Sequence, residues 1–334
     1  MDILIKSFNR PYYLDRCIQS IYANVLDSNI SIKILDDGTP SKYLEKLVLK
    51  FPNIQILKSD FYEEKSSQIA QNDSTISTKI PIQFWLECVK NASNYFVLLE
   101  DDIWFTQKIN LAQTCSVLED KNVVLLKLFW LNNPKLVYAQ TIENNKNVII
   151  YKPTLCTKNP FLYRIVFAMK RFNLPKLMRF FGLYSEEKAL NYYAMYGVAG
   201  VIFRKDYYIS LWKKHQNSVD ENLQLKNAVT FWHKNPSVLF ARTVEEIART
   251  GFTSSATHKS FQTNDFDVFV FNKILNEAWF NDGFDVSRTM PNDFNSADIA
   301  EIISNENHVN CQPKDWEKWV FYFKKQFQEI GCDI

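Results

Sequence analysis

The first 105 residues alternate between short strand-like runs and segments in which apolar residues recur at helical spacing. Residues 3–5 form the first apolar run, and Leu14, Cys17, Ile18 and Ile21 then share one helical face. The expected strands are 3–5, 30–35, 54–57 and one that begins at Tyr95, and the expected helices cover 11–22, 44–51 and 81–91. Because this order favours parallel strands with right-handed crossovers, we expect an α/β fold whose mixed, mainly parallel sheet is flanked by helices.

Polar side chains follow three of these expected strands. The three clusters are Ser7-Phe8-Asn9-Arg10, Asp36-Asp37-Gly38 and Glu100-Asp101-Asp102. In open α/β sheets, ligands bind at the carboxyl ends of the strands, so the three clusters are expected to converge on one crevice. Taken alone, Asp36-Asp37-Gly38 is equally typical of a turn that precedes a helix N-terminus.

The third cluster interrupts an apolar run with three consecutive carboxylates, Glu100, Asp101 and Asp102. Three like charges at a strand end need a compensating cation. Carboxylate oxygens suit Mg²⁺ or Mn²⁺, and such ions commonly hold the phosphates of a nucleotide. The triplet therefore predicts a nucleotide-dependent transferase, although Asp102 alone could instead be a helix N-cap.

Composition excludes several classes of protein. The 39 basic and 37 acidic side chains nearly cancel, so no global field attracts nucleic acid. The six cysteines have neither C-x-x-C pairs nor metal-ligand spacing, which favours reduced thiols in a cytoplasmic protein. We expect neither a signal peptide nor a membrane-spanning helix, because no basic leader and no apolar run of about 18 residues is present.

The second half of the sequence is less regular. Residues 123–130 and 148–151 are expected strands, and Gly197 and Gly200 lie beside another apolar run. Glycine at such a place lets a backbone approach a ligand closely, although close strand packing explains it equally well.

With these clusters in this order, the chain resembles the GT-A glycosyltransferases, whose nucleotide-sugar domain has this strand and helix order and a D-x-D-type metal motif. Residues 2–11 and the later Leu-Asp-Asp-Gly-Thr of 35–39 look like the family-2 pattern. Glu100-Asp101-Asp102 resembles the E-D-D motif of N-acetylglucosaminyltransferase I and its relatives. Residues 246–258, which begin Glu-Ile-Ala-Arg-Thr, are similar to the E-I-S-R-T…F-G…S-H block of those relatives.

The resemblance implies a GT-A, Rossmann-like catalytic domain over residues 1–260. Its first part, 1–105, would bind the nucleotide sugar, and 106–260 would bind the acceptor. Residues 261–334 match no motif of the family and are expected to form a helical C-terminal extension.

Carried over residue by residue, the resemblance assigns the loop with Ser7, Asn9 and Arg10 to the nucleotide and its diphosphate. It assigns Asp36 or Asp37 to the base or the ribose. Both assignments concern the donor half of the expected domain.

The same resemblance makes Asp102 the direct ligand of Mn²⁺ or Mg²⁺. Glu100 and Asp101 would hold the sugar or ribose and orient metal-bound water, and Arg249 would join the donor site. His258 would complete the metal shell or contact the diphosphate once its loop closes. A solvated loop histidine is the alternative for His258.

Transfer with inversion also needs a carboxylate that deprotonates the acceptor hydroxyl. Asp220 and Glu221 precede a helix-like stretch, about where the related enzymes place their base, and we favour Glu221 over Asp220. An acidic helix N-terminus that complements the helix dipole is the structural alternative.

Residues 160–182 contain five Lys or Arg, six Phe or Tyr and no acid. Such a segment could rest on the anionic inner face of a plasma membrane and give access to a lipid-linked acceptor. The alternative is an insertion that packs its rings on the core or lines the acceptor cleft.

Taken together, we expect a metal-dependent, inverting glycosyltransferase that moves a sugar from a nucleotide-diphosphate sugar, UDP-sugar favoured, to a hydroxyl of a glycan or glycolipid. Few glycines with many Lys, Asn and Ile suggest a bacterial source, which favours surface polysaccharide synthesis. A sugar nucleotidyltransferase is one alternative, but the loop after the first strand lacks the expected glycines. A non-catalytic carbohydrate-binding protein and a retaining mechanism also stay open.

Overall fold

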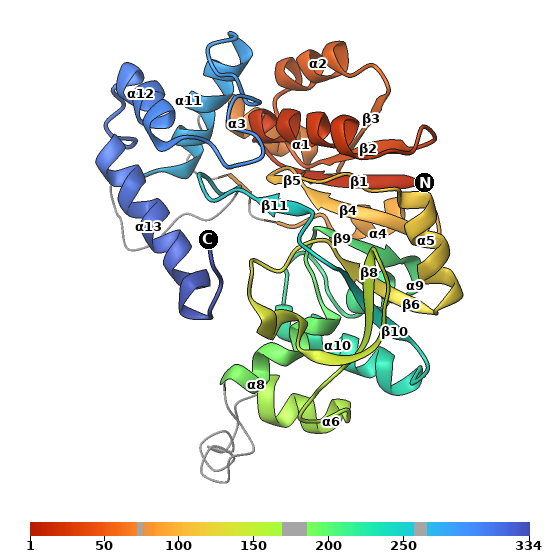
Figure 1. The fold of residues 1–334 in the computed structure, drawn as a ribbon. Coiled ribbons are helices and arrows are strands. Elements are labelled where there is room, and N and C mark those ends of the chain that lie inside the picture. The colour runs from red at the N-terminus through yellow and green to blue at the C-terminus, as the bar shows by residue number, and fades with distance from the viewer. Residues whose placement is uncertain (72–75, 78, 169–185, 257–265) are drawn as a thin grey trace. The chain divides into compact units, whose positions relative to one another are not determined.

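The computed structural model describes residues 1–71, 76–77, 79–168, 186–256 and 266–334 (Figure 1). The chain divides into two compact units. Unit 1 comprises Met1 and residues 82–98 and 110–246, whereas unit 2 comprises residues 2–81, 99–109 and 247–334.

Unit 2 begins with three parallel strands in the order β3-β2-β1. These are β1 (Asp2–Ser7), β2 (Ser31–Asp36) and β3 (Ile54–Lys58), with Ile3 opposite Ile32 and Ile34 opposite Ile56. The connecting helices are α1 (Pro11–Asn24) and α2 (Ser41–Lys50), and α3 (Tyr62–Ala70) follows β3. Every residue of β1 is buried, as expected for a strand covered on both faces.

The rest of unit 2 contains a two-stranded antiparallel sheet and three helices. β5 (Ile103–Phe105) pairs with β11 (Ala248–Thr250). The helices α11 (Val268–Phe280), α12 (Ser296–Glu306) and α13 (Pro313–Glu329) make the C-terminal region helical, as expected (Figure 1).

Buried Arg16 attaches the C-terminal region to α1. Its guanidinium lies 4.4 Å from the ring centre of Trp104 and 4.9 Å from that of Phe294. It also donates to the carbonyl oxygens of Val286, at 2.7 Å, and Asn292. The C-terminal residues thus share an aromatic core with the first helix of the unit.

Unit 1 contains a mixed sheet in which β9 (Val201–Arg204) runs antiparallel to residues 95–98 of β4 (Tyr95–Glu100) and to β6 (Val123–Lys127). β10 (Leu239–Thr243) pairs parallel with β6 and antiparallel with β8 (Val148–Pro153), which pairs with β7 (Ala139–Asn144). Its helical segments are α4 (Ile82–Lys90), α5 (Leu111–Asp120), η1 (Pro134–Val137), α6 (Pro160–Tyr163), η2 (Arg164–Ala168), α8 (Glu186–Leu190), η4 (Asn191–Met195), α9 (Lys205–Leu211) and α10 (Glu221–Lys234).

The predicted fold class is confirmed, since mixed sheet strands are flanked by helices and the C-terminal region is helical. The compact units group residues 247–334 with 2–81. The expected functional division of the chain at residues 105 and 260 stays a prediction. Of the segment 160–182, only residues 160–168 are described. There, the rings of Tyr163 and Phe167 are buried against Tyr192, whereas Phe161 is 67% exposed.

None of the helices among the described residues is both long and apolar enough to cross a membrane. Contact of residues 160–182 with a membrane surface stays a prediction.

Candidate functional site

The loop between β1 and α1 is held in an unusual backbone conformation. Asn9 has a positive φ of 53°, a region that asparagine tolerates better than most residues. Its backbone N–H donates to Thr39 Oγ1 at 2.9 Å, which joins this loop to the turn after β2. Ser7, Asn9 and Arg10 are all buried in unit 2. Their contact with a nucleotide stays a prediction.

Asp36 stabilises the turn after β2. It accepts from the backbone N–H groups of Gly38, at 3.0 Å, and Thr39, at 2.8 Å, and from Thr39 Oγ1 at 2.7 Å. Burial raises the pKa of Asp36 to about 6 despite these hydrogen bonds. Asp36 thus has the structural role that the sequence left open, that of a turn residue before the N-terminus of a helix.

Asp37 likewise forms hydrogen bonds with side chains of unit 2. It accepts from Ser59 Oγ and from Lys65 Nζ, both at 2.5 Å. Burial raises the pKa of Asp37, while Lys65 and Ser59 lower it. A contact of Asp36 or Asp37 with a base or ribose stays a prediction, and each would first have to exchange an internal partner.

The acidic triplet lies at the end of β4, and Arg10 neutralises its second and third members. Arg10 Nη1 donates to Asp102 Oδ2 at 2.9 Å, and Nη2 donates to Asp101 Oδ1. Asp101 Oδ2 also accepts from the backbone N–H of Phe8 at 3.2 Å. The Ser7 carbonyl oxygen in turn accepts from the Asp37 N–H at 3.0 Å, so the structure brings all three predicted clusters together.

Arg10 is 4% exposed and Asp101 is 2% exposed, so this ion pair is buried. Burial raises the pKa of Asp101 to about 7, while Arg10 lowers it. Although burial lowers the pKa of Arg10, the two aspartates raise it more. Arg10 is therefore a permanent cation inside the site.

Glu100, the first member of the triplet, has a different partner. Its Oε1 lies 3.7 Å from Lys6 Nζ, and its side chain is 36% exposed. Burial raises the pKa of Glu100, and Lys6 opposes that shift. Glu100 is thus more accessible to a ligand than Asp101.

Residues 248–251 lie directly beside the acidic triplet. β11 pairs with β5, which follows Asp102, and the N–H of Gly251 donates to the Asp102 carbonyl oxygen at 2.8 Å. Arg249 Nη1 donates to Asn292 Oδ1 at 2.7 Å. His258 lies outside the described residues, so its predicted metal contact stays a prediction.

A divalent cation can be tested against the donors present. No three His, Cys, Asp or Glu side chains within the described ranges gather as a metal site. However, Mg²⁺ commonly binds through one or two carboxylates, with waters and substrate phosphates as its other ligands. Asp102 Oδ1 forms no hydrogen bond with another described residue, so it fits such a role.

The predicted base residues belong to unit 1. Asp220 is the N-cap of α10, where its Oδ1 accepts from the N–H of Leu223 at 3.0 Å. Glu221 is the first residue of that helix and accepts from the Tyr193 side chain. Burial raises the pKa of Glu221, and that hydrogen bond lowers it. Asp220 thus has the helix-end role that the sequence left open, and the assignment of Glu221 or Asp220 as the base stays a prediction.

The sequence did not reveal several residues that hold this site together. Lys65 pairs with Asp37, and the Ser254 carbonyl oxygen accepts from Arg10 Nη1 at 3.4 Å. Asn276 on α11 donates to Asn9 across 267 positions of the chain. No local pattern marks such long-range partners, so only the three-dimensional fold identifies them.

No protein-family model matches this chain, and no curated protein matches it. Among solved structures, it is similar to the galactosyltransferase LgtC in complex with donor and acceptor sugar analogues, at 13% identity over 69% of this chain and 70% of that chain, with a TM-score of 0.34.

Two further solved structures are similar at 10% identity. S. aureus TarS 1–349 in complex with UDP-GlcNAc matches over 98% of this chain and 91% of that chain, with a TM-score of 0.34. A mycobacterial protein matches over 82% of this chain and 73% of that chain, with a TM-score of 0.40.

Proposed function

We propose that this protein is a metal-dependent glycosyltransferase that transfers a sugar from a nucleotide-diphosphate sugar to a hydroxyl of a glycan or glycolipid. The observation that carries this proposal is the buried contact of Arg10 with Asp101 and Asp102. It combines a fixed guanidinium with an acidic pair at a strand end, the usual position of a ligand in an α/β sheet.

This arrangement offers one donor, Arg10 Nε, and two acceptors, Asp102 Oδ1 and Glu100, to a ligand. Arg10 Nε is buried and has no hydrogen-bond partner among the residues that the structure describes. It can donate to a diphosphate oxygen, which guanidinium groups recognise well. Asp102 Oδ1 can hold Mn²⁺ or Mg²⁺, and Glu100 can accept from a sugar or ribose hydroxyl.

A bound Mn²⁺ or Mg²⁺ would stabilise the charge that develops on the departing nucleoside diphosphate. On the acceptor side, Glu221 would remove the proton of the attacking hydroxyl, giving inversion. The Tyr193 hydroxyl would orient the Glu221 carboxylate. Asp220 would stabilise the N-terminus of α10 as its N-cap.

The finer features of this proposal follow from the sequence. They are UDP as the nucleotide, bacterial surface polysaccharide synthesis, a cytoplasmic location, His258 as a further metal ligand and peripheral membrane contact through residues 160–182. Each extends the proposed activity, and none of them is needed for the role of Arg10 and Asp102.

A thermal-shift screen of UDP-, GDP- and CMP-sugars, with and without Mn²⁺, tests the proposed function. A donor at 100 times its Kd adds about 2.7 kcal/mol of stability, so at least one donor should raise Tm by several degrees only when Mn²⁺ is present. Asp102→Asn should lose this shift, whereas Asp60→Asn, at an exposed carboxylate of the same unit, should keep it. No shift with any nucleotide sugar would contradict the proposal.

A further inference from the structure

The helix α11 carries two buried amides one helical turn apart. Asn272 is 0% exposed and Asn276 is 1% exposed, whereas the other buried positions of this helix are apolar or aromatic. Apolar side chains would serve packing at these two positions as well, because a buried amide is stable only when it is hydrogen-bonded. The partners of the two amides therefore indicate their role.

Asn272 holds the segment that accepts from Arg10. Its Oδ1 accepts from Ser254 Oγ at 2.5 Å and from Tyr12 Oη at 2.9 Å. Its Nδ2 donates to the Ser255 carbonyl oxygen at 3.0 Å. Because a carbonyl oxygen only accepts, the orientation of this amide is fixed. One side chain thus attaches residues 254 and 255 to the first helix of the unit.

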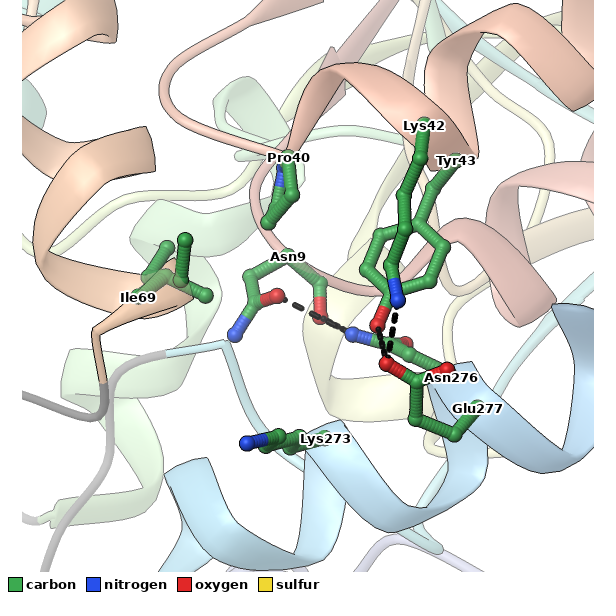
Figure 2. Close-up of a pocket in the computed structure, with 9 residues that line it drawn as sticks. Asn9, Pro40, Lys42, Tyr43, Ile69, Lys273, Asn276 and Glu277 are labelled. Atoms are coloured by element: carbon green, nitrogen blue, oxygen red, sulfur yellow. Dashed lines mark hydrogen bonds and ion pairs between the residues drawn. The ribbon is translucent and has the colours of Figure 1, made fainter.

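Asn276 holds the residue that precedes Arg10. Its Nδ2 donates to the Asn9 carbonyl oxygen at 3.1 Å and to Asn9 Oδ1 at 3.0 Å, beside the cavity drawn in Figure 2. These contacts support the positive φ of Asn9, a conformation that persists only where the surrounding structure stabilises it. Because Asn9 and Tyr12 flank Arg10 in the chain, α11 holds the β1–α1 loop on both sides of this residue.

The guanidinium of Arg10 is held at both of its terminal nitrogens. Nη1 donates to Asp102 and, at 3.4 Å, to the Ser254 carbonyl oxygen, and Nη2 donates to Asp101. Because a guanidinium is planar and rigid, fixing both terminal nitrogens also fixes the direction of Nε–H. Nε is buried and has no partner among the described residues. It is the donor that the proposed function assigns to the diphosphate.

We infer that α11 is a positioning element of the donor site, in which Asn272 and Asn276 hold Arg10 so that its Nε–H is directed to the diphosphate of the nucleotide. This inference rests on the proposed function. It gives a role to residues 261–334, which match no motif of the family that the chain resembles. Both asparagines act through Arg10, so neither needs to contact the nucleotide.

Calorimetric titration of the protein with UDP, GDP, CDP and ADP in the presence of Mn²⁺ first identifies the nucleotide that binds most tightly. Asn272→Ala should then lower the affinity for that nucleotide about 10-fold or more, because the partners that orient a binding residue commonly contribute this much. Asn276→Ala should also lower it.

Asn227→Ala is the matched control. Asn227 on α10 also uses its Nδ2 for two backbone carbonyl oxygens, those of Leu211 and Lys213, both at 2.9 Å. All three residues belong to unit 1 and none of these contacts involves Arg10. The nucleotide affinity of this variant should equal that of the wild type.

A double-mutant cycle separates positioning of Arg10 from a general loss of stability. In Arg10→Lys the ammonium has no planar fork to direct, so adding Asn272→Ala should lower the affinity by less than about 2-fold further. The free energy of unfolding in urea should fall in both backgrounds, since the hydrogen bonds of Asn272 are lost in each. An equal loss of affinity in the two backgrounds would overturn the inference.

Ser254→Ala replaces Asn272→Ala in the cycle if the latter does not fold. It removes only the hydroxyl that donates to Asn272 Oδ1, and it should lower the affinity about 3-fold. Unchanged affinity in the α11 alanine variants, with nucleotide binding by the wild type, would overturn the inference and leave the proposed function standing. Binding of none of the four nucleotides by the wild type would overturn the proposed function, and this inference with it.

Discussion

Arg10 Nη1 donates to Asp102 Oδ2 at 2.9 Å, although the two residues are 92 positions apart. This contact places a protein cation against the carboxylate that we expect to hold a metal ion. The same guanidinium also pairs with Asp101, so one side chain from the β1–α1 loop fixes the acidic turn after β4. Site stability and donor binding are therefore expected to depend on the same residue.

Removing Arg10 should destabilise the protein strongly. Arg10→Ala leaves Asp101, which is 2% exposed, as a buried charge without its cation. Breaking such a pair from one side costs about 3–5 kcal/mol. The free energy of unfolding in urea should fall by that amount.

Two variants control the Arg10 experiment. Asp101→Asn in the Arg10→Ala background should recover part of the loss, because it removes the unpaired charge. Arg288→Ala breaks an ion pair in which Arg288 is 70% exposed, and it should cost less than about 1 kcal/mol. Equal losses for Arg10→Ala and Arg288→Ala would show that the buried pair has no special role.

Gly251 is expected to tolerate no side chain. A Cβ there would lie 2.2 Å from Tyr13 Oη, and Tyr13 is fully buried with its hydroxyl bonded to Asp293. Gly251→Ala should cost about 1–3 kcal/mol through overpacking, measured by thermal or urea unfolding. Gly283→Ala, where the nearest atom would be 3.3 Å away, should cost clearly less. Similar losses in the two variants would refute the packing argument.

Asp36 should make stability depend on pH. Its pKa of about 6 in the folded protein exceeds its usual 3.8, so the folded state binds a proton more readily than the unfolded chain. Its contribution is fully present below about pH 4 and is lost as pH rises through 6. The shift of roughly 2 pKa units corresponds to a change of at most about 3 kcal/mol.

The measurement compares unfolding free energies of the wild type and Asp36→Asn between pH 4 and pH 7. The stability of the wild type relative to the variant should decrease as pH rises, because the variant lacks only the Asp36 carboxyl and every other titrating group is present in both proteins. A difference that stays constant across this range would contradict the raised pKa.

Glu221 should control the acidic limb of the pH–rate profile. A general base must be deprotonated, and burial raises the pKa of Glu221 above its usual value. The decline of kcat/KM at low pH should therefore begin above pH 4.5. Glu221→Gln should lower kcat by about 100-fold or more and remove this limb.

The neighbouring Asp220 supplies the control. Asp220→Asn keeps a side chain that can cap α10, so both turnover and stability should change little. Asp220→Ala should cost about 0.5–2 kcal/mol of stability and retain turnover. Loss of turnover in Asp220→Asn, with normal turnover in Glu221→Gln, would reverse the assignment.

Much of the fold could be predicted from the sequence because apolar periodicity records burial. The strand at residues 3–5 and the helix with Leu14 and Cys17 were found for this reason. β5 was not separated from the strand expected at Tyr95, and β11, whose sequence is Ala-Arg-Thr, has no apolar run to mark it. These two strands nevertheless connect Asp102 to Gly251.

The site was predicted in part. Strand-end positions identified Arg10, Asp101 and Asp102 as neighbours, because parallel strands bring their carboxyl ends together. The same reasoning could not distinguish a ligand-binding carboxylate from one with internal partners. Asp36, with its three hydrogen bonds, and Asp37, with Lys65, show this limit. Asn276 could not be found at all, since its contact with Asn9 depends on the position of α11.

Calorimetric titration of Mn²⁺ in the presence of saturating UDP tests the central claim most directly. The wild type and Asp60→Asn should bind Mn²⁺ with similar affinity. Asp102→Asn should bind it at least about 10-fold more weakly, because the amide lacks the charge that a divalent ion requires. An unchanged Mn²⁺ affinity in folded Asp102→Asn would contradict the role of Asp102 as the metal ligand of this site.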